Sequence, residues 1–178
     1  FHALPPLTTK DGELVNAVYG FFSIFLKALR ELNPDSVAAA FDLAAPTFRH
    51  QIFCHYKAKR KKAPEDFYRQ IPRIKGILNA FGIKIFEKEG FEADDIIGTI
   101  AMLAKTKSSD LETIILSSDA DVLQLVDAKT KALILKKGIS QTILYYEKGV
   151  QEKYQGLTPR QLIDFKALRG DPSDNIPG

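Results

Sequence analysis

The chain has very few of the residues that support thiol chemistry or soft-metal binding. Its 178 residues include one cysteine, Cys54, and three histidines. A single cysteine excludes an internal disulfide and fits a reducing cytosol. We expect Cys54 to be a buried or half-buried apolar side chain rather than a nucleophile. Because histidine is so scarce, a site built on imidazole ligands is not expected.

Long apolar runs and targeting segments are also missing. The run at residues 19–26 is among the longest, and Ser23 interrupts it, so no membrane span is predicted. There is no signal-peptide pattern. The sequence is 45% hydrophobic and 26% charged, which is typical of a globular domain with a core. Because it starts at Phe1 and stops at Gly178, we expect a single-domain fragment, residues 1–178, truncated at both ends.

Helical and strand patterns alternate along the sequence. After a predicted loop at 1–12, apolar spacing predicts helices over residues 14–32, 65–81, 93–104, 121–126, 150–154 and 158–170. Apolar runs predict strands over residues 36–41 (buried), 83–87, 113–116, 131–136 and, as a short strand, 142–146. Pro72 predicts a kink or break, Gly82 a helix end, Gly138 a turn, and Thr158 a helix cap. The alternation predicts an α/β fold with a mostly parallel sheet flanked by helices.

Acidic residues follow several of the predicted strands. The carboxyl ends of parallel strands meet at one edge of a sheet, where sites form. Carboxylates gathered there without cysteine or histidine favour Mg²⁺ or Mn²⁺, and two such ions can clamp a phosphodiester. Each acid also has a structural alternative as a helix cap or turn residue. The predicted metal ligands are Asp42, Glu92, Asp94, Asp95, Asp119, Asp121, Asp171 and Asp174.

A basic segment supplies the opposite charge. Residues 57–62 carry five positive charges in six positions, and Phe48, Phe53 and Tyr56 lie close by in sequence. Such a segment suits the phosphate backbone of nucleic acid, and the aromatic rings suit stacking on unpaired bases. The alternative is a solvated basic surface. The predicted DNA-binding residues are Arg49, Lys57, Lys59, Arg60, Lys61 and Lys62. Together the acids and the basic segment indicate a metal-dependent nuclease.

Several motifs then match a known family. They include Ala40-Phe-Asp42, Gly90-Phe-Glu-Ala-Asp-Asp95, Ser118-Asp-Ala-Asp121 and Gly170-Asp-Pro-Ser-Asp-Asn-Ile-Pro-Gly178. The chain resembles the 5′ nuclease domain of bacterial DNA polymerase I and, more broadly, the flap endonuclease family. The resemblance covers essentially the whole chain.

The resemblance implies a PIN-like (Rossmann-like) fold and cleavage of DNA at 5′ ends and flaps, removing RNA primers in replication and displaced strands in repair. It implies a first-metal group of Asp42, Glu92, Asp94, Asp95 and Asp119, and a second-metal group of Asp121, Asp171 and Asp174. Asp119 serves both in this interpretation. It places Lys57 and Arg60 in a helical arch as catalytic contacts to the scissile phosphate. The expected substrates are 5′ flaps, nicked or gapped duplexes and RNA primer–DNA junctions, bound by a monomer in the bacterial cytoplasm at the nucleoid.

The resemblance also implies two segments beyond this sequence. The family opens with a strand that bears another metal-binding aspartate, and it continues into a helix-hairpin-helix element. We therefore expect the fragment to be weak or inactive by itself. Two alternatives remain open, namely a non-catalytic module that binds DNA structures and a PIN-type ribonuclease.

Overall fold

The computed structural model describes residues 4–108, 110–136 and 141–178. The chain divides into two compact units. The first contains Phe1–Ala39, Lys62–Phe86 and Lys136–Gln141, and the second contains Ala40–Lys61, Glu87–Leu135 and Thr142–Gly178. The turn predicted at Gly138 and the start of the loop predicted at 1–12 lie outside the described residues.

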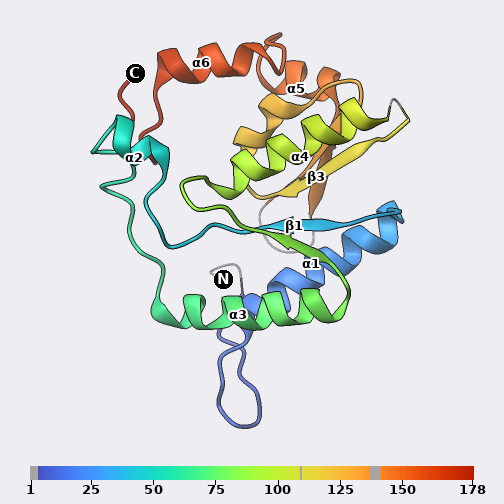
Figure 1. Cartoon of the computed structure of the whole chain (residues 1–178), viewed down its shortest axis with the longest axis vertical. Helices are drawn as coiled ribbons and strands as arrows, with labels where there is room; N and C mark the ends of the chain where they lie inside the picture. Colours follow the sequence, from blue (N-terminus) through green and yellow to red (C-terminus); the bar gives the residue numbers. More distant parts are fainter. Residues whose placement is uncertain (1–3, 109, 137–140) are drawn as a thin grey trace. The chain divides into compact units, whose positions relative to one another are not determined.

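Two helices, α1 (Asn16–Leu32) and α3 (Glu65–Ala80), pack together in the first unit (Figure 1). Apolar residues at helical spacing form the contact, with Phe25 of α1 and Ile74 and Leu78 of α3 buried. Asn33 ends α1 in a left-handed conformation, with its N–H donating to the Leu29 carbonyl, and Pro34 follows it. Both helices were predicted from apolar spacing.

The start of α1 is capped by α3. Val15 precedes α1 and supplies no side-chain cap. Gln70 is buried and its Oε1 accepts from the backbone N–H of Ala17 at 2.8 Å and of Val18 at 3.3 Å. These are donors that have no partner within the helix. A single buried amide of α3 thus fixes where α1 begins.

Helix α3 continues through Pro72, so the break predicted there does not occur. Pro72 is exposed, and water can therefore satisfy the carbonyl that loses its helical partner. The predicted helix end at Gly82 is confirmed. Its φ is +72°, and its N–H donates to the Asn79 carbonyl.

Strands β1 (Ala38–Ala40) and β2 (Lys84–Phe86) form a two-stranded sheet, with β2 in the first unit and Ala40 opening the second. The prediction of a buried strand at 36–41 is wrong in its burial. Ala38 is exposed and Ala39 and Ala40 are half-buried. Apolar composition marks a strand, but burial depends on what covers its faces.

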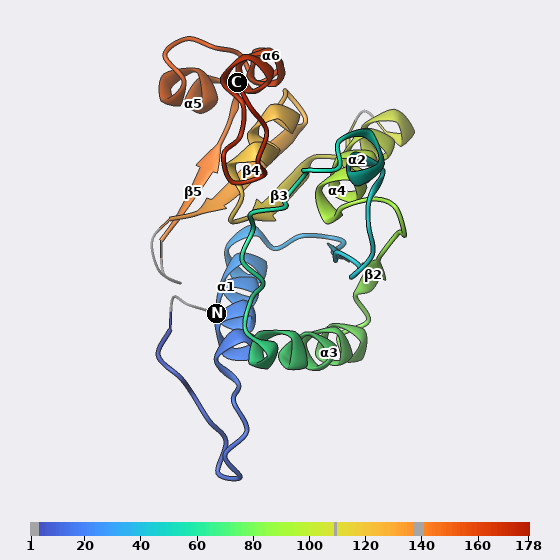
Figure 2. The same ribbon diagram turned by 90° about the vertical axis from the view of Figure 1, so that its left-hand side faces the viewer.

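The second unit is built on a three-stranded sheet in the order β3 (Thr113–Ser117), β4 (Thr130–Leu135), β5 (Thr142–Tyr145) (Figure 2). Strands β3 and β4 are parallel, with Thr113 opposite Thr130. Strand β5 runs antiparallel to β4, with Leu135 opposite Thr142. The parallel arrangement predicted from helix–strand alternation thus holds for β3 and β4. The link from β4 to β5 is too short for the crossover that parallel strands need.

Helices cover this sheet. They are α4 (Ala93–Lys107), the 3₁₀ helix η1 (Ala120–Leu125), α5 (Glu147–Lys153) and α6 (Gln161–Arg169), and the short α2 (Phe48–Ile52) belongs to the same unit. The core contains Ile115, Val122, Leu123, Val126, Ala132, Ile134, Val150 and Leu162. Thr158 is not the N-cap of the last helix, as predicted, because that position is Arg160; Thr158 Oγ1 instead accepts from the N–H of Gln161 at 3.4 Å in the turn before the helix. The α-helix itself begins at Gln161 because the preceding turn is tighter.

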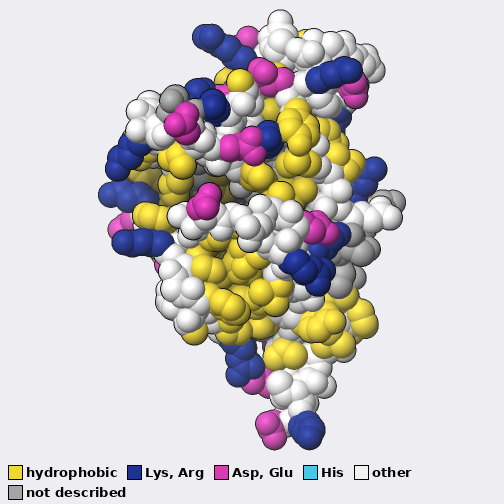
Figure 3. Space-filling view, turned by 90° about the vertical axis from the view of Figure 1, so that its right-hand side faces the viewer, with side chains coloured by type: hydrophobic (Ala, Val, Ile, Leu, Met, Phe, Trp, Pro, Cys, Tyr) yellow, Lys and Arg dark blue, Asp and Glu magenta, His cyan; other side chains and the backbone are white. Residues whose placement is uncertain are grey.

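Charges of both signs are mixed on the surface. Figure 3 shows acidic and basic side chains interspersed on one face, with hydrophobic side chains exposed between them. Within the described ranges, no helix is both long enough and apolar enough to cross a membrane.

The basic segment at 57–62 is a turn followed by irregular chain. The helical arch that the resemblance placed here is therefore not helical in this structure. Lys57 has a φ of +55°, and the like charges from Lys59 to Lys62 would repel one another at helical spacing. Cys54 lies in the same turn and is exposed, so the prediction of a buried or half-buried side chain is wrong. Nothing in the turn requires the Cys54 side chain to be covered, whereas Tyr56 of the same turn is buried.

Candidate active site

A single pocket of the second unit brings the predicted acids together. It has a volume of about 1110 Å³, and its lining includes all eight predicted carboxylates. Four cationic side chains also line it, namely Arg49, Lys57, Arg60 and Lys166. The predicted acids therefore lie near one another, although the strands that precede them belong to two sheets rather than one. Whether each acid binds a metal ion stays a prediction.

Four of the acids gather at the N-terminus of α4, namely Asp42, Glu92, Asp94 and Asp95. Glu92 is the N-cap residue, and Glu92 and Asp95 form a reciprocal capping box in which Asp95 Oδ2 accepts from the Glu92 N–H at 2.9 Å. Asp42 Oδ1, from beyond β1, accepts from the Ala93 N–H at 2.7 Å. The first-turn donors and the helix dipole favour negative charge at this position. The same acids therefore cap the helix, as the structural alternative predicted, and also line the pocket.

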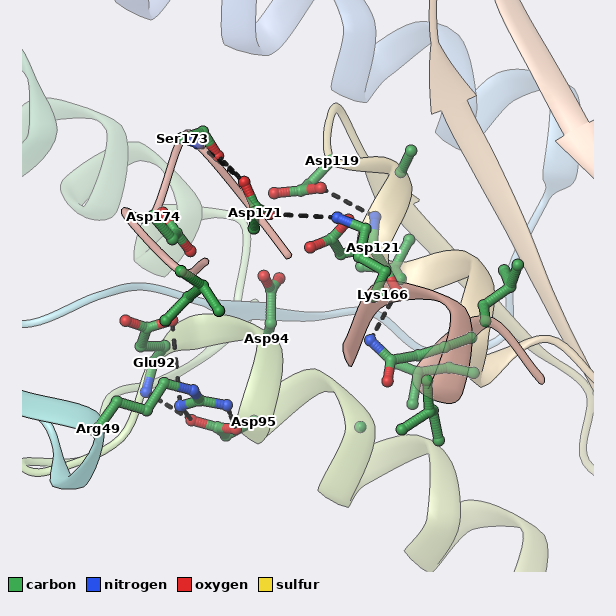
Figure 4. A pocket seen from close by; sticks show the side chains of 18 of the residues that line it. Arg49, Glu92, Asp94, Asp95, Asp119, Asp121, Lys166, Asp171, Ser173 and Asp174 are labelled. Carbon is green, nitrogen blue, oxygen red and sulfur yellow. Dashed lines mark hydrogen bonds and ion pairs between the residues drawn. The ribbon is translucent and has the colours of Figure 1, made fainter. Parts of the chain in front are cut away.

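Asp94 differs from its neighbours. It lies in the first turn of α4 and its carboxylate points towards Asp119, Asp121 and Asp171 (Figure 4). Burial raises its pKa to about 6, and the negative charges of Asp119, Asp42, Glu92 and Asp121 add to the effect. Asp94 is therefore the acid whose charged form is most disfavoured by burial and by the neighbouring carboxylates.

On one side of the pocket, arginine and lysine neutralise the acids. Arg49 of α2 makes a bidentate pair with Asp95, with both N–O distances at 2.7 Å. This pairing lowers the pKa of Asp95 against the opposing effect of burial. Lys57 Nζ lies 2.8 Å from Glu92 Oε1 and 3.9 Å from Asp174.

Tyr56 was predicted to offer a ring for base stacking, but it has a different role in the structure. Its ring is buried, and its hydroxyl lies within hydrogen-bond distance of Glu92, at 3.1 Å, and Asp174, at 3.2 Å. Burial and these two carboxylates raise the pKa of its hydroxyl, which stays a proton donor. Because its ring is buried, Tyr56 does not offer the base-stacking surface that was expected. It joins two acids instead.

On the other side, Lys166 of α6 joins two acids. Its ammonium forms an ion pair with Asp121 and lies 3.2 Å from Asp171 Oδ2. The pKa of Lys166 is raised, because the two carboxylates outweigh the lowering effect of burial. Asp119 caps η1 by accepting from the Asp121 N–H at 2.9 Å.

The loop after α6 carries Asp171 and Asp174. Hydrogen bonds from the Ser173 hydroxyl and N–H lower the pKa of Asp171 to about 2, and Lys166 adds to this effect. This is the turn geometry predicted as an alternative role. Gly170 closes the loop with a φ of +72°, and a Cβ there would lie 2.5 Å from the backbone nitrogen of Gly178. The loop also binds the basic turn, because the Lys57 N–H donates to the Asp174 carbonyl at 2.9 Å.

The donor set suits a hard divalent ion. The pocket lining offers carboxylate oxygens and contains no cysteine or histidine among the described residues. Burial and then the charges of four nearby carboxylates raise the pKa of Asp94, so a cation beside it would favour its charged form. In the part of the chain that is described, however, no three acidic, histidine or cysteine side chains are grouped closely enough to hold an ion. Several of the carboxylates are directed at Arg49, Lys57 and Lys166 instead.

The predicted DNA-binding residues divide into two sets. Arg49, Lys57 and Arg60 line the pocket, and the Arg60 side chain is 61% exposed. Lys59, Lys61 and Lys62 are exposed and are not part of its lining.

Sequence reasoning missed Lys166 and the bonding role of Tyr56. The available signal for Lys166 was its position, one helical turn before the Gly170-Asp171 motif. No local pattern marks the hydroxyl of Tyr56 as a partner of two distant acids.

Comparisons with known proteins show the family of the chain and its fold. Residues 1–155 match the family model described as 5′-3′ exonuclease, N-terminal resolvase-like domain. DNA polymerase I of Bacillus subtilis is 46% identical over 178 residues, and that of Mycobacterium tuberculosis is 44% identical over 180 residues. The matches cover all of this chain and 20% of each relative, so the chain spans about a fifth of their length.

Solved structures share the fold. The bacteriophage T5 5′-exonuclease with bound zinc ions gives a TM-score of 0.76 at 21% identity, covering 91% of this chain and 61% of that one. A T5 flap endonuclease in a complex with DNA and metal ions gives a TM-score of 0.76 at 20% identity, with the same coverage. The expected PIN-like α/β fold is therefore confirmed. With the family model matched over residues 1–155, the chain belongs to the 5′-3′ exonuclease family and contains its N-terminal resolvase-like domain.

Proposed function

We propose that the chain hydrolyses DNA phosphodiester bonds as a divalent-metal-dependent 5′-3′ exonuclease and flap endonuclease, as part of a longer DNA polymerase I. The observation that carries the proposal is the single pocket in which eight carboxylates and four cations meet. An acid cluster alone suits a metal site, and a basic rim suits phosphate. A nuclease of this family needs both next to each other.

We assign the carboxylates to two Mg²⁺ or Mn²⁺ ions. Asp42, Glu92, Asp94, Asp95 and Asp119 would hold the first, and Asp121, Asp171 and Asp174 the second, with Asp119 open to both. When bound, such ions supply a water of lowered pKa and stabilise the leaving oxygen. Asp94 is well placed as a ligand in electrostatic terms, because burial and the neighbouring carboxylates both raise its pKa, and a cation beside it would favour its charged form.

The chain's own cations are assigned to the substrate. Arg60 is exposed at the pocket and 3.9 Å from Asp174, so its guanidinium is available to a phosphate. Lys57 lies deeper, with its side chain 22% exposed, and points at Glu92 beside the proposed ions. We propose that these two residues contact the scissile phosphate, and that Arg49 holds Asp95 in place. Lys59, Lys61 and Lys62 would attract the DNA backbone through their exposed charges.

The proposed substrates are 5′ flaps, nicked or gapped duplexes and RNA primer–DNA junctions. They connect the activity to primer removal in replication and to DNA repair. We further propose that the protein acts as a monomer in the bacterial cytoplasm, where the nucleoid DNA lies.

The test is cleavage of a 5′-labelled flap duplex by the chain in a form that includes the flanking segments expected for the family. We expect cleavage with Mg²⁺ and none with EDTA. Asp119→Ala should lower the rate by orders of magnitude, because this acid lies between both proposed ion groups. Asp164→Asn is the matched control, since Asp164 is an exposed acid on α6 that does not line the pocket. It should cleave at the wild-type rate.

Three outcomes would contradict the proposal. Cleavage that persists in EDTA would exclude the metal role, and wild-type rates for Asp119→Ala would exclude this pocket. Binding of flaps without any turnover would favour a DNA-structure-binding module. Faster cleavage of RNA hairpins than of DNA flaps would favour a PIN-type ribonuclease.

A further inference from the structure

Lys166 occupies a distinct position among the cations of the pocket. It lies near the end of α6, and its ammonium contacts Asp121 and Asp171 at once. These two acids come from different elements, η1 and the loop after α6. Lys166 therefore joins the two segments whose acids we assign to the second ion.

The other cations do not duplicate this role. Arg49 pairs with Asp95, and Lys57 pairs with Glu92, on the side of the pocket formed by α4. Among the ion pairs of the described residues, those of Asp121 and Asp171 are made with Lys166. Lys57 and Arg60 lie 3.9 Å from Asp174, the third acid assigned to the second ion, but the positive charge at Asp121 and Asp171 comes from Lys166.

An ammonium and a divalent ion compete for such oxygens. A Mg²⁺ or Mn²⁺ ion binds carboxylate oxygens directly and at short range. A lysine ammonium at hydrogen-bond distance uses lone pairs of the same oxygens and repels the incoming ion. Both cannot sit between Asp121 and Asp171 in the arrangement described here.

Lys166 is free to leave. Its side chain is 40% exposed and has four rotatable bonds, so a change of rotamer would move the charge into solvent. Asp171 would keep its hydrogen bonds from Ser173 and so hold its position. The acids would remain in place while the lysine moves.

We propose that Lys166 is an internal cation that occupies the Asp121–Asp171 side of the pocket and must leave these oxygens before a divalent ion binds there. Lys166 thereby stabilises the ion-free protein and weakens the binding of the second ion. The inference rests on the proposed metal-dependent function, and it concerns which residue sets the affinity for the second ion.

The experiment is a calorimetric titration of the chain with Mn²⁺, without DNA, for wild type, Lys166→Met and Lys166→Arg. We expect Lys166→Met to lower the dissociation constant of the weaker ion by about fivefold or more, the lower end of typical coupling between ligands, because the competing charge is only partly buried. Lys166→Arg keeps the charge and should stay within about twofold of wild type on the same scale. The matched control is Lys105→Met. Lys105 forms a similarly exposed ion pair with Asp127, and neither residue lines the pocket.

Thermal melting supplies a second readout. In EDTA, Lys166→Met should melt below wild type, since two neighbouring carboxylates lose their partner. Saturating Mn²⁺ should raise its melting temperature more than that of wild type. Lys166→Gln serves as a second neutral variant if Lys166→Met fails to fold.

The outcomes separate the two proposals. If wild type binds Mn²⁺ and the neutral variants bind it equally or more weakly, Lys166 does not compete and this inference is overturned, while the proposed metal site stands. If wild type and all variants bind no Mn²⁺, the metal site itself fails and the inference fails with it. A matching gain in Lys105→Met would show a general effect of net charge and would also overturn the inference.

Discussion

Two adjacent acids of α4 should respond to neutralisation with opposite signs. Asp94 faces four other carboxylates, and Asp95 is paired with Arg49. In EDTA at pH 8, Asp94→Asn should stabilise the protein and Asp95→Asn should destabilise it. The two residues share one helix turn and one pocket, so each is the control for the other.

The magnitude for Asp94 follows from its pKa, which rises from 3.8 to about 6 on folding. At about 1.4 kcal/mol per unit, the upper limit of the effect is about 3 kcal/mol. Asp94 is exposed to solvent, and solvent screening reduces this to about 1–2 kcal/mol. For Asp95, loss of a bidentate charged pair in a partly buried setting should cost about 1–2 kcal/mol.

The pH dependence fixes the sign. Because the folded pKa of Asp94 is raised, its favourable contribution is complete below the unfolded pKa of about 4 and is lost as the pH rises through about 6. Asp94→Asn lacks this loss, so its advantage over wild type should appear above pH 6 and vanish near pH 4. The pKa of Asp95 is lowered, so its contribution is present above the unfolded pKa and is lost as the pH falls through the folded value.

The assay is urea unfolding in EDTA at pH 4, 6 and 8, followed by circular dichroism. Adding Mg²⁺ should stabilise wild type more than Asp94→Asn, because the ion relieves the same repulsion. Equal or lower stability of Asp94→Asn at pH 8, or the same difference at pH 4 and pH 8, would refute the reasoning.

Two further predictions concern positions that shape the fold. Gly170→Ala combines a positive φ with a Cβ placed 2.5 Å from the backbone nitrogen of Gly178, so it should cost about 1–3 kcal/mol and weaken Mn²⁺ binding by displacing the Asp171 loop. Gly156→Ala has a φ of +98° but meets nothing within 4 Å, so calorimetry should show unchanged Mn²⁺ binding; equal losses in both variants would contradict this account. Gln70→Leu removes the acceptor for two N–H groups of α1 and should lower the free energy of unfolding by about 1–3 kcal/mol in urea titrations, whereas no loss would show that water replaces the amide.

Much of the local structure followed from sequence alone. Helical spacing located α1, α3 and α4, and Asn33 and Gly82 ended two of them where a left-handed residue is needed. These features depend on residues three or four positions apart, which a sequence displays directly. The sequence also indicated that the eight carboxylates lie near one another, and they do line one pocket. The single sheet edge that was expected is not the reason, because the strands before these acids belong to two sheets and Asp171 and Asp174 follow α6.

Burial and pairing were decided by the tertiary structure. Apolar composition did not reveal that β1 is partly exposed, nor did the scarcity of cysteine reveal that Cys54 faces solvent. The basic run did not show that Lys57 points at Glu92 while Lys59 faces outward. Each of these depends on what lies across the chain, and no local period encodes it.

The electrostatic character of the site depends on the same long-range contacts. Arg49 and Asp95 are 46 residues apart in sequence, and Tyr56 and Asp174 are 118 apart. The sequence determined that acids and bases of the right kind are present and in which segments. Only the tertiary structure determined which acids pair with Arg49, Lys57 and Lys166, and that Asp94 lies among other carboxylates. The reason is that Coulomb energies depend on distance in space and on burial.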